Sequence, residues 1–257
     1  MFRLAVLIPV ALLTAAAQEC SELAYQSVDF FAAKSAAQWR QEILPAIRNQ
    51  RAVVTVDPEA ERYVTLLGNR LVDVLPAPQP SEFRFILYDD NMGLDAPWYG
   101  SLRVNPQIRV LPGDIVLVPL SLIDVTLTES ELAAAIARGI AHAGLEHFTR
   151  FISKSTQVIM PIPPAGARPP VPPFTKTLLF PRSFEREADC AAIGVLAGAH
   201  FDPEALARYA RNSLASFDTS DSRVQAIEAA VSKFPPRSYD PDDSPQFEQL
   251  KVRLKRR

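Results

Sequence analysis

The sequence predicts an α+β fold that is mainly helical and contains a small β-sheet with an exposed edge strand. Several segments place apolar residues at helical spacing, whereas only two short segments have the pattern of a strand. With 257 residues, of which 48% are hydrophobic, the chain is also long enough to bury one substantial core. We therefore expect one main domain.

The first 17 residues have the pattern of an export signal. Arg3 precedes a short apolar run that ends in three alanines, and small residues are typical of a cleavage point. The run is shorter than the roughly 20 apolar residues of a membrane-spanning helix. We expect an exported protein, periplasmic or secreted, without a stable transmembrane anchor. A lipid anchor at Cys20 is disfavoured because the two residues before it are not small.

Helical segments follow the signal. Apolar spacing predicts helix within an N-terminal segment over 18–49. Asp57-Pro58 begins the next helix, because proline suits a first helical turn, where its missing N–H would have no partner anyway. Pro76 is the first of three closely spaced prolines that end this helix.

Two strands are predicted next. Residues 83–88 alternate or run apolar, and turn residues follow them. A second strand, over about 115–120, follows the turn at 111–114, and we expect it to be the edge strand. Thr128-Glu129-Ser130-Glu131 is a capping box, so a helix is expected to begin there and to run to about Phe148.

The remainder of the chain combines one irregular loop with further helices. Seven prolines exclude regular structure from the loop over 160–174, because each lacks an N–H donor. Helices are expected over 185–199, 202–213 and 223–231. The predicted boundaries are an export signal over 1–17, an N-terminal helical segment over 18–49, a main domain over 50–235 and a C-terminal tail over 236–257.

Charge and cysteine content restrict the possible partners. The formal net charge is -2 and the sequence pI is about 6.0, so no overall basic field attracts nucleic acid. The basic residues near the C-terminus are expected to be a solvated end. Cys20 and Cys190 could form a disulfide in an oxidising compartment, but the sequence leaves open whether they meet.

Two motifs suggest a family. Ala137-Arg138-Gly139-Ile140-Ala141-His142 lies on the capped helix, and Glu185-Arg186-Glu187-Ala188-Asp189 lies on a later helix. This arrangement resembles the gluzincin zinc metallopeptidases of the CAAX prenyl protease and HtpX type, which have His-Glu-x-x-His on one helix and Glu-x-x-Ala-Asp on another. Flanking segments also match, notably Leu111-Pro112-Gly113 and Phe201-Asp202-Pro203, and the resemblance covers roughly residues 50–235.

The resemblance implies zinc as cofactor, with His142 and Glu185 as metal ligands. In the family, two histidines four residues apart and a third ligand from a second helix bind the metal, and the glutamate beside the first histidine activates water. Here Arg138 replaces the first histidine and Gly139 replaces the glutamate. Arginine has only donors, and glycine has no side chain that could act as a base. The His-Pro pair that commonly precedes the family's arginine is also missing before Arg223, so no catalytic residue is assigned.

We expect Arg138 to take the place of the metal. By the resemblance, Asp189 supports the first histidine, so Asp189 and Glu185 could both face Arg138. A guanidinium group matches carboxylates in a bidentate manner and would keep Glu185 from being buried unpaired. The alternative is that Arg138 points to solvent.

A displaced metal site is a further possibility. If the helix continues to about Phe148, His142 and Glu146 lie one turn apart and could bind a metal together with Glu185. His147 would then face elsewhere, because it lies five residues after His142.

These observations favour a catalytically degenerate pseudopeptidase that binds extended peptide or unfolded envelope proteins. Pairing of a peptide with a strand edge needs neither zinc nor glutamate. The alternative is an active zinc-dependent metalloendopeptidase with an atypical metal site that acts on unfolded envelope proteins.

Overall fold

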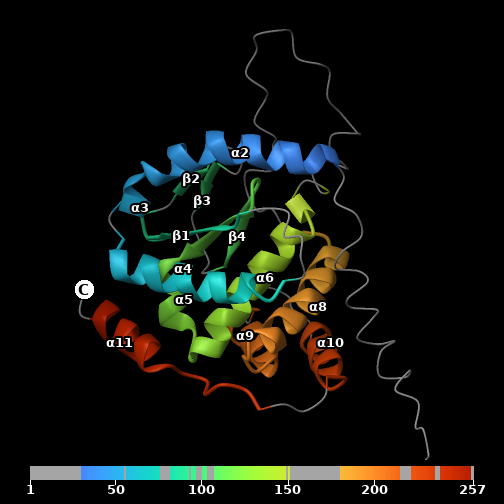
Figure 1. The fold of residues 1–257 in the computed structure, drawn as a ribbon. Helices are drawn as coiled ribbons and strands as arrows, with labels where there is room; N and C mark the ends of the chain where they lie inside the picture. The colour runs from blue at the N-terminus through green and yellow to red at the C-terminus, as the bar shows by residue number, and fades with distance from the viewer. Residues whose placement is uncertain are drawn as a thin grey trace, which may run out of the picture.

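The chain forms a mixed α and β structure in a computed structural model (Figure 1). The structure describes residues 30–54, 56–75, 82–92, 94–96, 100–102, 107–148, 150, 180–214, 221–234 and 238–255. The predicted export signal over 1–17, Cys20 and the loop over 160–174 lie outside the described residues. The elements are α2 (Phe30–Arg48), α3 (Arg51–Val54), α4 (Pro58–Val72), β1 (Arg84–Tyr88), β2 (Leu94–Ala96), β3 (Gly100–Leu102), β4 (Arg109–Leu111), β5 (Ile115–Pro119), α5 (Leu120–Val125), α6 (Glu129–Gly144), α8 (Arg182–Gly198), α9 (Glu204–Leu214), α10 (Asp221–Val231) and α11 (Pro245–Leu254).

The main sheet has the order β1-β5-β4, with β1 parallel and β4 antiparallel to β5. The prediction that residues 115–120 form the edge strand is therefore wrong, because β5 is the central strand. The turn after Leu111 places Gly113 at φ 83° and Asp114 at φ 58°, which folds β4 back onto β5. All five residues of β5 are buried, as a strand covered on both faces requires. β2 and β3 form a separate antiparallel pair.

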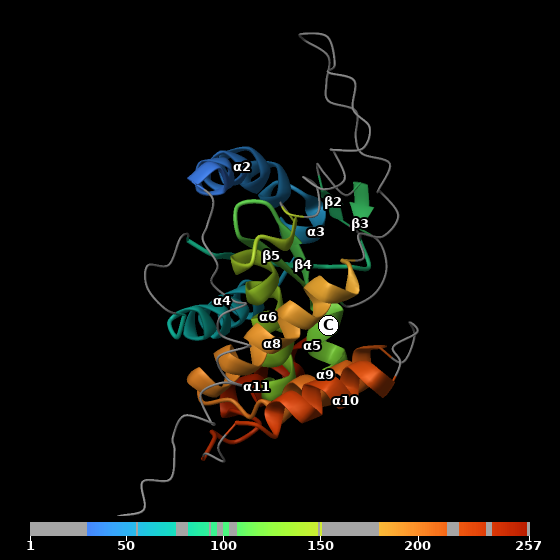
Figure 2. The same ribbon diagram turned by 90° about the vertical axis from the view of Figure 1, so that its right-hand side faces the viewer.

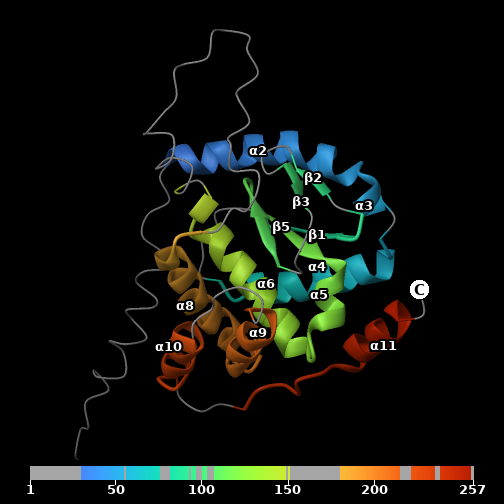
Figure 3. The ribbon, with the colours of Figure 1, turned by 180° about the vertical axis from the view of Figure 1, so that it is seen from behind.

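Helices cover both faces of the sheet. Successive side chains of a strand point to opposite faces. Accordingly, Phe85 and Val116 pack with α4 and α6, whereas Ile86 and Leu117 pack with α2 and α3. Figure 1 shows α2 above the sheet and the other long helices below it, and Figure 3 shows β1 and β5 beneath α2 from behind. The result is a three-layer arrangement with one apolar cluster on each side of the sheet.

The N-terminal helix is part of the main domain. Ile43 and Ile47 of α2 are fully buried against the outer face of the sheet. The predicted division between an N-terminal segment over 18–49 and a main domain that starts at residue 50 therefore does not hold for the described part of that segment. The predicted helix start at Asp57 is present, and the Asp57 side chain accepts a hydrogen bond from the backbone N–H of Glu59 at 2.9 Å.

The C-terminal residues also belong to the core. Phe247, Leu250 and Leu254 of α11 are buried in the larger apolar cluster. Arg253 donates through Nε to the buried Asp57 carboxylate at 2.7 Å, and the Lys251 ammonium donates to the Thr126 carbonyl at 2.7 Å. The prediction of a C-terminal tail over 236–257 is therefore wrong for its described part, residues 238–255.

Helix α6 begins at the predicted capping box. The Thr128 hydroxyl accepts a hydrogen bond from the backbone N–H of Glu131 at 3.2 Å, and the Glu131 carboxylate accepts one from Leu127 N–H at 2.9 Å. The helix ends at Gly144 rather than near Phe148, because Glu146 adopts φ 52° and the chain leaves the helical path. This earlier end changes where the residues after Gly144 lie.

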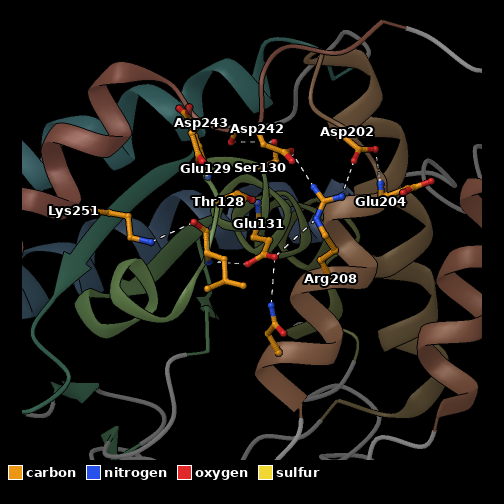
Figure 4. Close-up of polar contacts among 12 residues, drawn as sticks. Thr128, Glu129, Ser130, Glu131, Asp202, Glu204, Arg208, Asp242, Asp243 and Lys251 are labelled. Carbon is orange, nitrogen blue, oxygen red and sulfur yellow. Dashed lines mark hydrogen bonds and ion pairs between the residues drawn. The ribbon is translucent and has the colours of Figure 1, made fainter.

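The segment before α11 completes the start of α6 (Figure 4). The Asp243 carboxylate accepts a hydrogen bond from Glu129 N–H at 2.8 Å, and the Asp242 carbonyl accepts one from Ser130 N–H at 3.1 Å. In return, the Glu129 carboxylate accepts a hydrogen bond from Ser244 N–H at 2.7 Å. These bonds satisfy N–H groups that a helix start leaves without intrahelical partners. The C-terminal segment thus holds the helix that carries the candidate site.

Among the described residues, no helix is both long enough and apolar enough to cross a membrane. Cys190 of α8 takes part in a disulfide bond.

Candidate functional site

Two helices, α6 and α8, bring the predicted site residues together, and a third, α10, packs beside them. α8 packs against both α6 and α10 (Figure 2). Arg138 and His142 lie one turn apart on α6, and Glu185 and Asp189 lie one turn apart on α8. Residues at this spacing share one helix face. The two predicted motifs therefore face each other across the contact between α6 and α8.

Arg138 forms ion pairs with both carboxylates. Its Nη2 atom pairs with Glu185 Oε2, and its Nε donates to Asp189 Oδ1 at 3.2 Å. The Arg138 side chain is only 14% exposed, so the alternative in which it points to solvent is excluded. Burial lowers the pKa of Arg138 below its ordinary value, and the charge of Arg223 lowers it further. The close carboxylate of Asp189 opposes that effect and keeps the guanidinium group the favoured form.

A second arginine, Arg223 of α10, binds the same carboxylates. Its Nε donates to Asp189 Oδ2 at 2.7 Å and its Nη2 donates to Asp189 Oδ1 at 2.6 Å, a bidentate arrangement. Its Nη1 lies 3.5 Å from Glu185 Oε2. Arg223 is a site residue that was not predicted from the sequence, in which it only follows the place of a missing His-Pro pair. The signal that could have found it is the family arginine itself, which the resemblance aligns with Arg223.

Gly139, where the resemblance expects a catalytic glutamate, faces the sheet. A Cβ atom on Gly139 would lie 2.6 Å from Cγ2 of Ile108 and 3.1 Å from Cγ1 of Val116. Ile108 precedes β4 and packs against the core, and a β-branched side chain has little freedom to move aside. A glutamate side chain therefore has no room at this position in the present packing.

His142 is buried and neutral at neutral pH. Its ring is 4% exposed and stacks on Phe180, with ring centroids 4.6 Å apart. Burial lowers the pKa of His142 well below its ordinary value, and the charges of Arg138 and other neighbours act in the same direction. Its Nε2 lies 3.9 Å from Glu185 Oε1, beyond hydrogen-bonding distance.

His147 contacts His142, so the prediction that it faces elsewhere is wrong. The two Nδ1 atoms are 2.9 Å apart. The prediction assumed that α6 continues through His147, whereas the helix ends at Gly144 and the left-handed residue Glu146 turns His147 back toward His142. The His147 ring is fully buried and stacks on Phe184, with centroids 4.5 Å apart.

A chain of hydrogen bonds orients both histidine rings. Burial lowers the pKa of His147 to about 4, so it is neutral at neutral pH. Its Nε2 lies 3.2 Å from Glu187 Oε2, and the carboxylate also accepts a hydrogen bond from Arg150 at 2.7 Å. Because a carboxylate only accepts, Nε2 of His147 is assigned the proton and its Nδ1 accepts the proton of His142 Nδ1. This assignment leaves Nε2 of His142 as an acceptor on the side of Glu185.

The residues present do not fit a zinc site of the gluzincin type. His142 and Glu185 remain from the implied ligand set, but the guanidinium groups of Arg138 and Arg223 contact the Glu185 carboxylate. The helical spacing that would have placed Glu146 beside His142 is lost, because Glu146 lies after the end of α6. Across the described residues, His, Cys, Asp and Glu side chains form no group of three or more that could hold a metal ion.

Comparison with protein-family models and with curated proteins finds no match to this chain. The gluzincin relationship therefore stays a prediction from the motif residues and their order. The chemistry of the site therefore follows from its own groups. Two arginines neutralise two carboxylates, hydrogen bonds orient two neutral histidines, and the ion pairs join α6, α8 and α10.

Proposed function

We propose that the protein is an exported, gluzincin-like pseudopeptidase that binds extended peptide or unfolded envelope proteins without hydrolysing them. The observation that carries this proposal is the ion pairing of Arg138 with Glu185 and Asp189. A permanent cation in contact with a ligand carboxylate repels a metal cation, and metal-assisted hydrolysis requires that metal.

The packing of Gly139 supports the same proposal. In the family, the residue at this position is the base that activates water. In this chain, Ile108 and Val116 occupy the space that the first side-chain carbon of a glutamate at position 139 would need. An active zinc endopeptidase would have to recover both a ligand and a base, so the observations favour the pseudopeptidase over the alternative.

The binding half of the proposal rests on the resemblance. In proteases of this type, an extended substrate pairs with a strand edge through main-chain hydrogen bonds. β1 and β4 are the outer strands of the three-stranded sheet, and β4 directly follows Ile108, beside α6. Peptide binding at a sheet edge does not involve Arg138 or Gly139 and can outlast the loss of catalysis.

Export is supported by two features. The first 17 residues have the pattern of a signal peptide. The disulfide bond of Cys190 is the second, because disulfides persist in oxidising compartments and are rare in the cytosol.

The loss of catalysis is tested by metal content and proteolysis. We expect purified protein to contain far less than one zinc ion per chain and to leave casein intact with or without a chelator. Stoichiometric zinc that disappears in the H142A variant, together with chelator-sensitive cleavage of casein, would establish the active peptidase instead.

The binding half is tested with matched peptides. Fluorescein-labelled extended peptides from casein are titrated with the protein, and the same sequences carrying N-methyl groups at alternate residues serve as controls. We expect the unmodified peptides to bind and the N-methylated ones to lose at least about tenfold in affinity, because main-chain donors supply the contacts. Equal binding of both sets would argue against strand addition.

A further inference from the structure

The site contains two arginines whose side chains are only 14% and 18% exposed, and they come from different helices. Arg138 replaces a ligand on α6, whereas Arg223 comes from α10 and lies outside the helix pair of the motif. Both meet the two carboxylates of α8, so two positive and two negative groups share one contact region.

The geometry gives Arg223 the larger share of Asp189. Arg223 binds both oxygens of that carboxylate at 2.6 and 2.7 Å, whereas Arg138 reaches one oxygen at 3.2 Å. Arg223 also approaches Glu185 at 3.5 Å. Removal of Arg138 alone would thus leave a full positive charge next to the carboxylate that a metal would need.

We infer that Arg138 and Arg223 together supply the two positive charges that a divalent metal would bring to Glu185 and Asp189, and that both must be removed before this site can bind a metal. This inference deepens the proposed loss of the metal centre. It assigns to Arg223 a role in excluding cations that the motif does not reveal.

The charge balance explains why one arginine would not suffice. Asp189 and Glu185 side chains are only 7% and 23% exposed, and buried carboxylates are costly unless cations neutralise them. Two guanidinium groups leave the four-residue cluster neutral. A zinc ion added beside Arg223 would raise the charge and meet the guanidinium group at short range.

The test builds a metal site from the chain's own residues. The R138H variant introduces a histidine one turn before His142 and opposite Glu185, which gives three potential ligands. R138H/R223M additionally removes the second cation. R138H/R211M is the matched control, because Arg211 of α9 forms its ion pair with Glu228 of α10 and not with the two site carboxylates.

Zinc affinity is measured by equilibrium dialysis, and cobalt spectra report the ligand geometry. We expect R138H/R223M to bind one metal ion per chain at least about a hundredfold more tightly than R138H or R138H/R211M, because like charges at this separation repel strongly in a partly buried site. Equal affinity of R138H and R138H/R223M would overturn the inference. The inference would also be overturned if neither R138H nor R138H/R223M bound zinc.

Folding is followed by circular dichroism with and without zinc. If R138H/R223M is unfolded without metal, recovery of its helical signal on addition of zinc supports the inference, since metal binding is then coupled to folding. An absence of any response to zinc counts against it. These outcomes concern variants only, so they are distinct from zinc or proteolysis in the wild-type protein, on which the proposed function depends.

Discussion

At the residue scale, the properties of the site follow from burial. Arg138, Asp189, His142 and His147 all have little exposure, so each charge needs a counter-charge and each histidine stays neutral. The resemblance pointed to Glu185 and Asp189 as the partners of Arg138, and their four-residue spacing places both on one helix face. The sequence did not predict Arg223 or the contact of His147 with His142, since both depend on where other segments turn.

Replacement of Arg138 by alanine is expected to destabilise the protein by about 3 kcal/mol, because the largely buried carboxylates of Glu185 and Asp189 then share Arg223 in place of two cations. Urea unfolding measures the loss. R211A is the control, because the exposed Arg211–Glu228 pair is expected to contribute less than about 1 kcal/mol. Equal effects of both substitutions would show that the Arg138 cluster contributes no more than a surface pair.

Acid is expected to destabilise the protein through His147. Its folded pKa of about 4 lies below the ordinary value of 6.5, so protons bind the unfolded state more readily. The contribution is fully present above about pH 6.5 and is lost as the pH falls from there toward 4, with a total of about 3 kcal/mol. Burial is the main cause of the low pKa of His147; the charges of Arg150 and Arg138 lower the pKa further, whereas Glu187 raises it.

Unfolding free energies at about pH 7 and about pH 4.5 test this dependence. The H147N variant should show a flatter acid limb than the wild type. An unchanged slope in that variant would assign the acid sensitivity to other groups.

At the element scale, the packing of α6 on the sheet explains why Gly139 is small. The helix approaches β5 and Ile108 so closely that even one added carbon meets side-chain atoms. The capping box predicted the start of this helix, because Thr128 and Glu131 act locally. Its end could not be predicted from apolar spacing, which continues past Gly144 although the chain turns at Glu146.

The G139A variant is expected to lose about 2 kcal/mol of stability, because its Cβ would meet Ile108 Cγ2. The I108A/G139A double variant should lose less than the sum of the single variants, since I108A removes the contacting atoms. Thermal unfolding of the four proteins completes this cycle. Strict additivity would mean that the Gly139–Ile108 contact does not limit the packing.

At the scale of the whole molecule, distant segments of the chain stabilise one another. α2 covers the outer face of the sheet, and the C-terminal segment caps α6 and packs α11 into the core. α10 and α11 lie at opposite ends of the helical layer below the sheet (Figures 1 and 3). The C-terminal contacts lie in the segment that was predicted to be a tail. Polar and charged residues separate the three buried apolar residues of α11, so this short helix has only a weak apolar pattern.

The F247A variant is expected to destabilise the protein by about 4 kcal/mol, because Phe247 is fully buried in the main core. V252A on the same helix is the control and should change stability by less than about 0.5 kcal/mol, since Val252 is 48% exposed. Chemical unfolding compares the two. A small effect of F247A would indicate that α11 is not needed for the fold.

The sequence by itself determined the features that depend on neighbours along the chain. These include the α+β class, the helix starts at Asp57 and Thr128, and the i and i+4 spacing that puts Glu185 and Asp189 on one face of α8. The tertiary structure decided the features that depend on which segments meet in space. It placed β5 in the centre of the sheet, brought Arg223 from α10 to the same carboxylates, turned His147 onto His142 and packed α11 into the core. Local geometry repeats along the chain and can be read from spacing, whereas long-range contacts depend on the paths of turns that spacing does not encode.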